Sequence, residues 1–293
     1  MLALGVGLGV LFSASGCRRR SAPDEAPREA PKGRRKAAPR GPQLRETPSE
    51  RPQESPAPAR PEAVPEPSSK ALPKVAVVVD DLGYAEPELV TRLCAQPVPF
   101  SVAVLPFLPH SRESAEIAHA RGKEVLLHLP MEPLGYPGPG RNPGEGAILF
   151  DLPEREVRAR VRRALLEVPF RRGVNNHMGS RITPDRTRMT WVMEEIRAAK
   201  CFFVDSRTEK DSVAFDVARA LKVRAVQRRV FLDDVRSFPE MEKQWERALA
   251  LARKEGEVLI IGHVYPESVE ALERLVSRSR GEVRFVSAGE LAR

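Results

Sequence analysis

Two adjacent carboxylates end the first apolar run of the C-terminal part of this chain. The stretch "VAVVVDDLGY" (75–84) places Asp80 and Asp81 after five small or β-branched residues, a run typical of a strand buried on both faces. Two acids at the end of such a strand lose solvation and repel each other. Capping the next helix needs only one acid, so a cap does not account for the pair. The pair therefore predicts a site with chemistry of its own.

Further polar side chains follow other predicted strands. They are His128 in "VLLHLPMEP", His177 in the polar loop "GVNNHMGS" (173–180), Asp205 after "FFV", Asp233 and Asp234 after "VFL", and His263 in "VLIIGHVYP". Taken singly, Asp205 and Asp234 are explained as well by helix caps, and His128 by burial in a core. In a βα barrel, however, the loops at the C-terminal ends of different strands build one site. The joint pattern therefore favours a site.

A divalent metal gives the two adjacent acids separate roles. A cation beside Asp81 would lower its pKa and make it a ligand. Neutral imidazoles of His128 and His177 would complete a set of two histidines and one carboxylate with an open position. Asp80 would then take a proton from water activated by the metal. Zinc is the metal expected for this set.

Short apolar strands alternate with amphipathic helical patterns from residue 74 onward. Strands are predicted at 75–79, 101–105, 125–129, 202–204, 223–226, 229–232, 258–262 and 283–286, and helices near 86–95, 111–121, 154–168, 186–199, 211–221, 239–255 and 267–279. Such alternation indicates an α/β domain with a parallel sheet covered by helices. With seven or eight strands, we expect a distorted or incomplete (β/α) barrel. An open doubly wound sheet is the competing architecture, but no glycine-rich phosphate-binding loop follows the first strand.

Composition separates residues 18–73 from a domain at 74–293. The segment 18–73 holds 13 of the 28 prolines and no aromatic residue, which predicts a disordered, solvated linker. Its 13 basic and 8 acidic residues supply five of the eight net positive charges, so the domain gives no indication of nucleic-acid binding. Cys94 and Cys201 lack the spacing of a zinc–thiolate site, and the sequence leaves their pairing open.

Residues 1–17, "MLALGVGLGVLFSASGC", form an apolar run that suits a secretory signal and is short for a membrane-spanning helix. The end "ASGC" resembles a bacterial lipoprotein processing site, which implies lipidation of Cys17; an ordinary export segment is the alternative. Arg18 and Arg19 follow the cysteine in place of aspartate, which by the same resemblance implies the outer membrane. We expect an exported protein held on the periplasmic face of a membrane by a lipid anchor, with its oligomeric state left open.

Five motifs occur in order along 74–293: "VVVDDLGY", "LHLPMEP", "GVNNHMGS", "FVDSRT" and "IGHVYP". Together they resemble the divergent polysaccharide deacetylases, which are related to the carbohydrate deacetylases with a distorted (β/α) barrel. The resemblance implies Asp80 as the catalytic base and His263 as the general acid. It also implies Asp81 and His128 as metal ligands.

One departure from the wider superfamily concerns the third ligand. The usual second motif has two histidines one helical turn apart, whereas here Glu132 stands four residues after His128. Pro130 and Pro133 exclude a regular helix between them. Either His177 or Glu132 would therefore complete the metal set.

The resemblance implies a metal-dependent hydrolase that removes acyl groups, N-acetyl in particular, from a cell-envelope glycan. The residues expected to orient the substrate or to support His263 are Asn175, Asn176, Asp205, Arg207 and Asp233. A turn explains the two adjacent asparagines equally well.

Two alternatives stay open. One is a catalytically silent, envelope-tethered protein that binds glycans or acts as a scaffold and keeps the deacetylase fold. The other is an aspartyl phosphatase with Asp80 as the nucleophile, against which stands Leu82, where those enzymes need a second acid.

Overall fold

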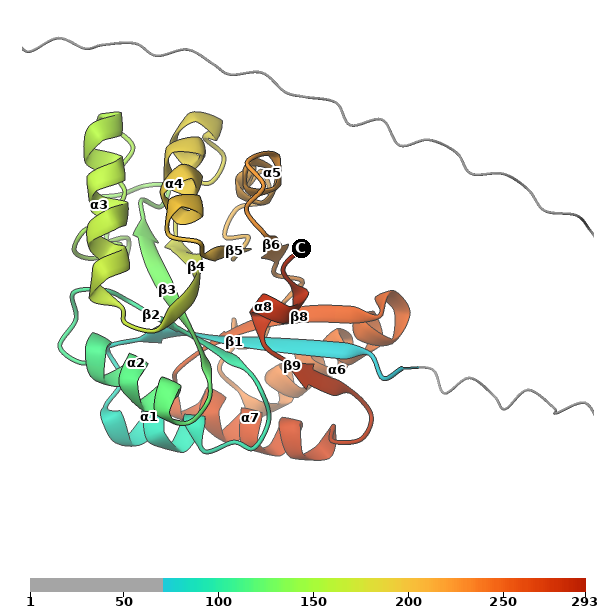
Figure 1. Ribbon diagram of the computed structural model, residues 1–293. Helices are drawn as coiled ribbons and strands as arrows, with labels where there is room; N and C mark the ends of the chain where they lie inside the picture. Colours follow the sequence, from blue (N-terminus) through green and yellow to red (C-terminus); the bar gives the residue numbers. More distant parts are fainter. Residues whose placement is uncertain (1–70) are drawn as a thin grey trace, which may run out of the picture. The chain divides into compact units, whose positions relative to one another are not determined.

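Parallel strands connected by helices run through residues 71–293, the part of the chain that the computed structural model describes (Figure 1). The strands are β1 (Lys74–Leu82), β2 (Ser101–Val104), β3 (Glu124–Met131), β4 (Arg171–Met178), β5 (Phe202–Asp205), β6 (Ala225–Gln227), β7 (Val230–Phe231), β8 (Glu257–His263) and β9 (Arg284–Val286). The helices are α1 (Pro87–Cys94), α2 (Ser111–Ala120), α3 (Glu154–Glu167), α4 (Arg186–Ala198), α5 (Ala214–Ala220), α6 (Phe238–Glu255), α7 (Pro266–Arg278) and α8 (Ala288–Leu291). Within 71–293, none of these helices has the length and apolar content to cross a membrane.

The expectations for the N-terminal segments lie outside the described residues. They concern the signal at 1–17, the lipidation of Cys17 and the linker at 18–73, of which only residues 71–73 are described.

The sheet curls until its two edges nearly meet. The strand order is β6-β5-β4-β3-β2-β1-β8-β7, the paired strands are parallel, and β9 pairs with the start of β1. Strands β6 and β7 lie at opposite ends of this order, yet only Arg228 and Arg229 separate them in the chain. Three Cα steps span at most about 11 Å, so the two edges lie close together. The predicted incomplete (β/α) barrel is therefore confirmed, and the doubly wound alternative is wrong.

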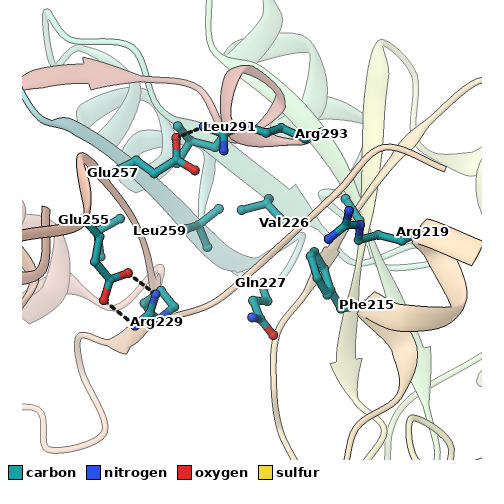
Figure 2. A pocket seen from close by; sticks show the side chains of 12 residues that line it. Phe215, Arg219, Val226, Gln227, Arg229, Glu255, Glu257, Leu259, Leu291 and Arg293 are labelled. Carbon is teal, nitrogen blue, oxygen red and sulfur yellow. Dashed lines mark hydrogen bonds and ion pairs between the residues drawn. The ribbon is translucent and has the colours of Figure 1, made fainter. Parts of the chain in front are cut away.

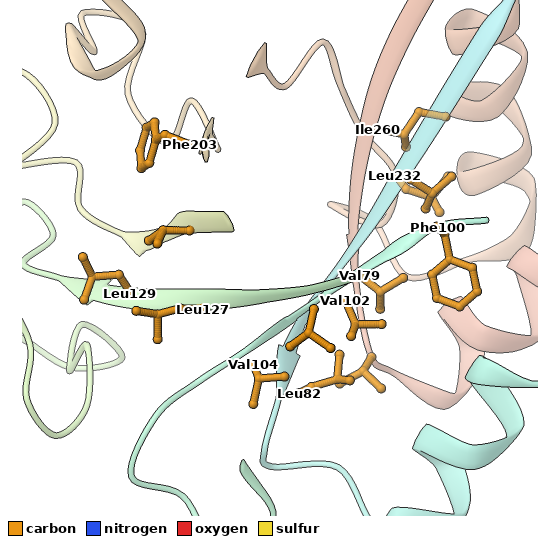
Figure 3. Packing of buried hydrophobic residues seen from close by; sticks show 14 of the residues in the cluster. Val79, Leu82, Phe100, Val102, Val104, Leu127, Leu129, Phe203, Leu232 and Ile260 are labelled. Carbon is orange, nitrogen blue, oxygen red and sulfur yellow. The ribbon is translucent and has the colours of Figure 1, made fainter. Parts of the chain in front are cut away.

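Alternate residues along the strands divide the apolar side chains into two clusters. Figure 3 shows part of the outer cluster, which contains Val79 of β1 and Leu127 and Leu129 of β3 together with buried side chains of the helices. The inner cluster contains Ala76, Val78 and Leu126 from the same strands. Continuing the inward series along each strand leads to polar residues: Asp80 in β1, His128 in β3, Asn175 and His177 in β4, and His263 in β8. The two-residue period of the strands thus gathers these side chains inside the barrel.

Strand β4 corrects the expected loop at 173–180. It runs from Arg171 to Met178 and pairs with β3 and β5. The sequence hides this strand because its inward positions carry polar side chains where an ordinary strand carries apolar ones. At the inward position Gly173, a Cβ atom would come within 2.6 Å of the Phe202 ring. The missing side chain is therefore what lets β4 pack into the barrel wall.

A cavity of about 360 Å³ lies where the barrel wall is incomplete, between β6 and the start of β8 (Figure 2). Ion pairs between Arg229 and Glu255 and between Arg293 and Glu257 run along its wall. The cavity borders the beginning of β8, whereas His263 stands at the end of that strand. It is therefore separate from the polar edge of the barrel.

The two cysteines of the described part are buried free thiols. Burial raises the pKa of Cys94 to about 11 and also raises the pKa of Cys201. Neither thiol is thus poised for reaction as a thiolate.

Candidate metal centre

Asp80 and Asp81 both reach the same histidine because β1 is irregular at its end. Neighbouring side chains of a regular strand point to opposite faces. The β1–β2 register shifts between Val79 and Leu82, and Asp81 has a left-handed φ of 65°. This conformation costs a non-glycine residue about 1–3 kcal/mol and is retained mostly where function needs it. The irregularity turns Asp81 into the interior beside Asp80.

Three potential ligand atoms meet beside Asp81. Its Oδ1 atom lies 3.3 Å from His128 Nε2 and 3.1 Å from His177 Nδ1, and the two nitrogens are 3.1 Å apart. This Oδ1 atom is buried and has no hydrogen-bond partner among the described residues. Atoms that ligate one tetrahedral zinc ion at about 2.0–2.1 Å are about 3.3 Å from each other. The three residues therefore fit a divalent cation in both type and spacing.

Glu132, the alternative third ligand, is bonded elsewhere. One of its oxygens accepts a hydrogen bond from the backbone N–H of Phe150 at 2.6 Å, and the other accepts from the guanidinium of Arg181. The side chain is buried with both oxygens used. His177, which lies within 3.1 Å of Asp81, is thus the residue that completes the set.

Asn175 is fully buried and connects Asp80 to His128. Its Nδ2 donates to Asp80 Oδ1 at 2.9 Å, and its Oδ1 lies 2.8 Å from His128 Nδ1. A carboxylate only accepts hydrogen bonds, so the amide nitrogen faces Asp80 and the amide oxygen accepts from His128. The proton of His128 is therefore on Nδ1, and its Nε2 lone pair faces Asp81 and His177. One carboxamide thus orients a candidate metal ligand and the neighbouring acid.

Burial and nearby charges shift the pKa values of Asp80, Asp81 and His128. Burial is the leading influence on Asp80 and raises its pKa, although His128 and His263 oppose it. Burial also acts to raise the pKa of Asp81, but the adjacent imidazoles of His128 and His177 outweigh it and hold the pKa well below its usual range. Burial acts to lower the pKa of His128, but Asp80 and Asp81 outweigh it, and the pKa is raised. Asp81 is thus suited to bind a cation, and Asp80 to accept a proton.

His263 faces the site from the neighbouring strand β8, where it is in register with Asp80 of β1. Its Nδ1 lies 3.0 Å from Asp233 Oδ1, and its backbone N–H donates to Asp233 Oδ2 at 2.7 Å. Burial acts to lower the pKa of His263, but the hydrogen bond and charge of Asp233 raise it to about 9. The imidazole is therefore cationic at neutral pH, and its Nε2–H remains available for donation.

The other predicted site residues shape the loop after β5. Asn176 is buried in β4, and its Oδ1 accepts from the backbone N–H of Ser206 at 2.9 Å. Asp205 accepts from the backbone N–H of Arg207 at 2.8 Å, and the guanidinium of Arg207 donates to the carbonyl of Lys210. The side-chain amides of Asn175 and Asn176 thus make hydrogen bonds within the protein, and the substrate contacts expected from the sequence stay a prediction.

Sequence reasoning missed several residues that contact the predicted ones. Ser268 donates to Asp233 at 2.6 Å, and Ser206 Oγ lies 3.3 Å from the amide nitrogen of Asn175. Two aromatic rings pack against His263: Phe231 at 5.2 Å, edge to face, and Tyr265 at 5.5 Å between centroids. Two of these residues stand in motifs of the sequence: Tyr265 in "IGHVYP" and Ser206 in "FVDSRT".

The motifs and the fold are both found in known proteins. Residues 77–292 match a family described as divergent polysaccharide deacetylase. The uncharacterized protein YibQ of Escherichia coli is 37% identical over 218 residues, which cover 74% of this chain and 67% of that protein. An uncharacterized protein of Haemophilus influenzae is 34% identical over 225 residues, which cover 77% of this chain and 79% of that protein.

Among solved structures, the crystal structure of the uncharacterized protein ATU2773 from Agrobacterium tumefaciens superimposes with a TM-score of 0.70. It is 24% identical, and the match covers 78% of this chain and 92% of that one. This likeness supports the fold.

Proposed function

Because this chain belongs to the divergent polysaccharide deacetylase family, we propose that it is a metal-dependent hydrolase that removes N-acetyl groups from a cell-envelope polysaccharide. The observation that carries the proposal is the meeting of Asp81 Oδ1, His128 Nε2 and His177 Nδ1 within 3.1–3.3 Å of one another. We call these three atoms the ligand triangle. Beside it, the buried acid Asp80 of β1 is in register with the cationic imidazole His263 of β8.

The residues around the triangle have complementary proton-transfer roles in this proposal. A divalent cation held by Asp81, His128 and His177 would polarise the acetyl carbonyl and make water more acidic. Asp80, whose pKa is raised by burial, accepts the proton that water loses on attack. His263, held cationic by Asp233, donates a proton to the departing amine. One base and one acid at neutral pH are what amide hydrolysis requires.

The proposal is tested by acetate release. The full chain, loaded with zinc, is incubated with a panel of N-acetylated and O-acetylated envelope oligosaccharides, with the Asp80→Asn protein as the control. Acetate release from an N-acetylated glycan that the control lacks would support the proposal. Stoichiometric metal without acetate release from any acetylated glycan would instead favour the silent glycan-binding alternative.

Asp233→Asn is expected to move the alkaline limb of the pH profile to lower pH. Burial is the largest influence on His263 and lowers its pKa, and Asp233 is the main group that opposes it, so without the charge of Asp233 the pKa falls from about 9. A general acid must be protonated, so the rate declines as pH rises through that pKa. We expect the limb to shift down by more than one pH unit, measured as kcat/KM against pH.

The titration of His263, followed by NMR, checks this prediction independently of turnover. Ser268→Ala, which removes the other side-chain partner of Asp233, is the matched control and is expected to shift the limb much less. An unchanged His263 titration in Asp233→Asn would contradict the assignment of Asp233.

We also propose that the protein is exported and anchored by lipid at Cys17, on the periplasmic face of the outer membrane. The support is the apolar run at 1–17 and its "ASGC" end. Full-length protein is then expected in the membrane fraction, and Cys17→Ser is expected to release it or to block its processing. A Cys17→Ser protein that is processed and located like the native one would exclude the anchor. A Cys94→Ser variant controls for the loss of a thiol as such.

A further inference from the structure

An exposed arginine lies one aromatic ring away from His263. The Tyr265 ring is 5.5 Å from the His263 ring between centroids, and the guanidinium carbon of Arg236 is 4.5 Å from the Tyr265 centroid. Arg236 belongs to the segment between β7 and α6 that also carries Asp233, the partner of His263. Among residues 71–293, its guanidinium has no ion-pair partner within 4.0 Å and no hydrogen-bond partner.

A second arginine lies beside another aromatic neighbour of His263. Arg228 stacks on Phe231, with 4.9 Å between its guanidinium carbon and the ring centroid, and Phe231 packs edge to face against His263. The guanidinium of Arg228, however, donates to two backbone carbonyls of the loop after β5. Of the two arginines beside the aromatic neighbours of His263, Arg236 is the one whose donors remain free for a ligand.

The ring of Tyr265 contacts both Arg236 and His263. Burial raises the pKa of Tyr265, the charge of Asp81 adds to the rise, and the charge of Arg236 opposes it. Both charged groups therefore act on the same phenol. A sugar whose amide nitrogen approaches His263 would have its substituents within reach of the Arg236 side of this ring.

We propose that Arg236 binds an anionic group, a carboxylate or a phosphate, on the sugar that carries the amide, which makes the ligand an acidic glycan. The inference rests on the proposed function for the position of that sugar. A guanidinium presents a planar fork that matches two anionic oxygens, and stacking on Tyr265 orients the fork. Asp234, two residues earlier and exposed, is the nearby charge that would weaken binding of the same anion.

The test compares the binding of three sugars that share the N-acetyl group. N-acetylglucosamine, its 6-phosphate and its 3-O-lactyl ether are titrated separately against the full, zinc-loaded chain. At least one acidic sugar is expected to bind about tenfold more tightly than the neutral one, the scale of a charge-assisted hydrogen bond. The arm that shows the preference distinguishes phosphate from carboxylate. Arg236→Gln is expected to remove the preference without changing the affinity for the neutral sugar.

The matched control is Arg219→Gln. Arg219 is also exposed and lies 5.8 Å from the Phe215 centroid, but it lines the cavity at the other end of β8. This variant is expected to keep the preference, whereas Asp234→Asn is expected to increase it.

Two results would overturn the inference: neither acidic sugar binds more tightly than the neutral one, or the preference survives in Arg236→Gln. Failure of the proposed function gives a different result. An Arg236-dependent preference without acetate release would leave the anion site standing and remove the hydrolase. Acetate release from neutral glycans alone would support the hydrolase and exclude the anion site.

Discussion

Asp81→Asn is expected to lose the metal, whereas Asp80→Asn is expected to keep it and to lose turnover by roughly a hundredfold or more. Of the two aspartates, only Asp81 contributes an atom to the group of three candidate ligand atoms, with His128 and His177. A neutral amide is a poor ligand for a dication. Asp80 lies farther away, with its Oδ2 3.6 Å from His128 Nε2 and its Oδ1 accepting from Asn175. Elemental analysis of each purified full chain, together with acetate release, measures both effects.

Three further variants define the ligand set. His128→Ala and His177→Ala are expected to weaken metal binding, and Glu132→Gln is the control. Glu132 is a buried carboxylate that directly follows β3, the strand of His128, but its oxygens accept hydrogen bonds from Phe150 and Arg181. Its replacement is therefore expected to lower the melting temperature and leave the metal content unchanged.

Two other outcomes would contradict the roles assigned to Asp80 and Asp81. If Asp80→Asn strips the metal while Asp81→Asn remains loaded and active, the roles implied by the family are exchanged in this chain. If neither change affects the metal content, the triangle is not a metal site, and the proposed hydrolase fails with it.

The acids at the end of β1 illustrate what the sequence could predict. A strand buried on both faces is a continuous apolar run, so its end is visible, and residues at strand ends of a parallel barrel share one edge. Asp80, Asp81, His128 and His263 could therefore be assigned to one site, and alternating strands and helices predicted the barrel.

The sequence alone could not decide between the two candidates for the third ligand, and the reason is physical. The choice between His177 and Glu132 depends on which face each side chain occupies, and that depends on whether its segment is a strand. Segment 171–178 is one, but its interior positions hold Gly173, Asn175 and His177, which erase the apolar signal. Once β4 is known, its two-residue period places all three inward. The polar residues that build the site thus conceal the strand that carries them.

The same concealment applies to Asn175, which reads as a turn residue in the sequence and is a fully buried connector in the structure. Asn175→Ala is expected to weaken metal binding by about 10–100-fold and to slow turnover as well. The change removes the acceptor that fixes the tautomer of His128 and the donor that orients Asp80. Metal affinity is measured by competition with a chelator, and turnover by acetate release, both on the full chain.

Asn175→Asp separates the two roles of this side chain. The new carboxylate keeps an acceptor for His128, so metal binding is expected to be retained. It also places a second acid where Asp80 had a donor at 2.9 Å, and repulsion between the acids displaces the base. We therefore expect a loaded protein with strongly reduced turnover.

Asn176→Ala is the matched control, because Asn176 is an adjacent buried asparagine whose hydrogen bonds run to the loop after β5 and to Met178. Its loss is expected to lower the melting temperature while the metal stays bound. Equal metal loss in Asn175→Ala and Asn176→Ala would mean that burial of a polar pair, rather than the bridge between His128 and Asp80, maintains the site. An Asn175→Ala protein that binds metal fully and is active would show that the hydrogen bonds of Asn175 to His128 and Asp80 are not needed. Among the described residues, no other side-chain amide contacts both His128 and Asp80.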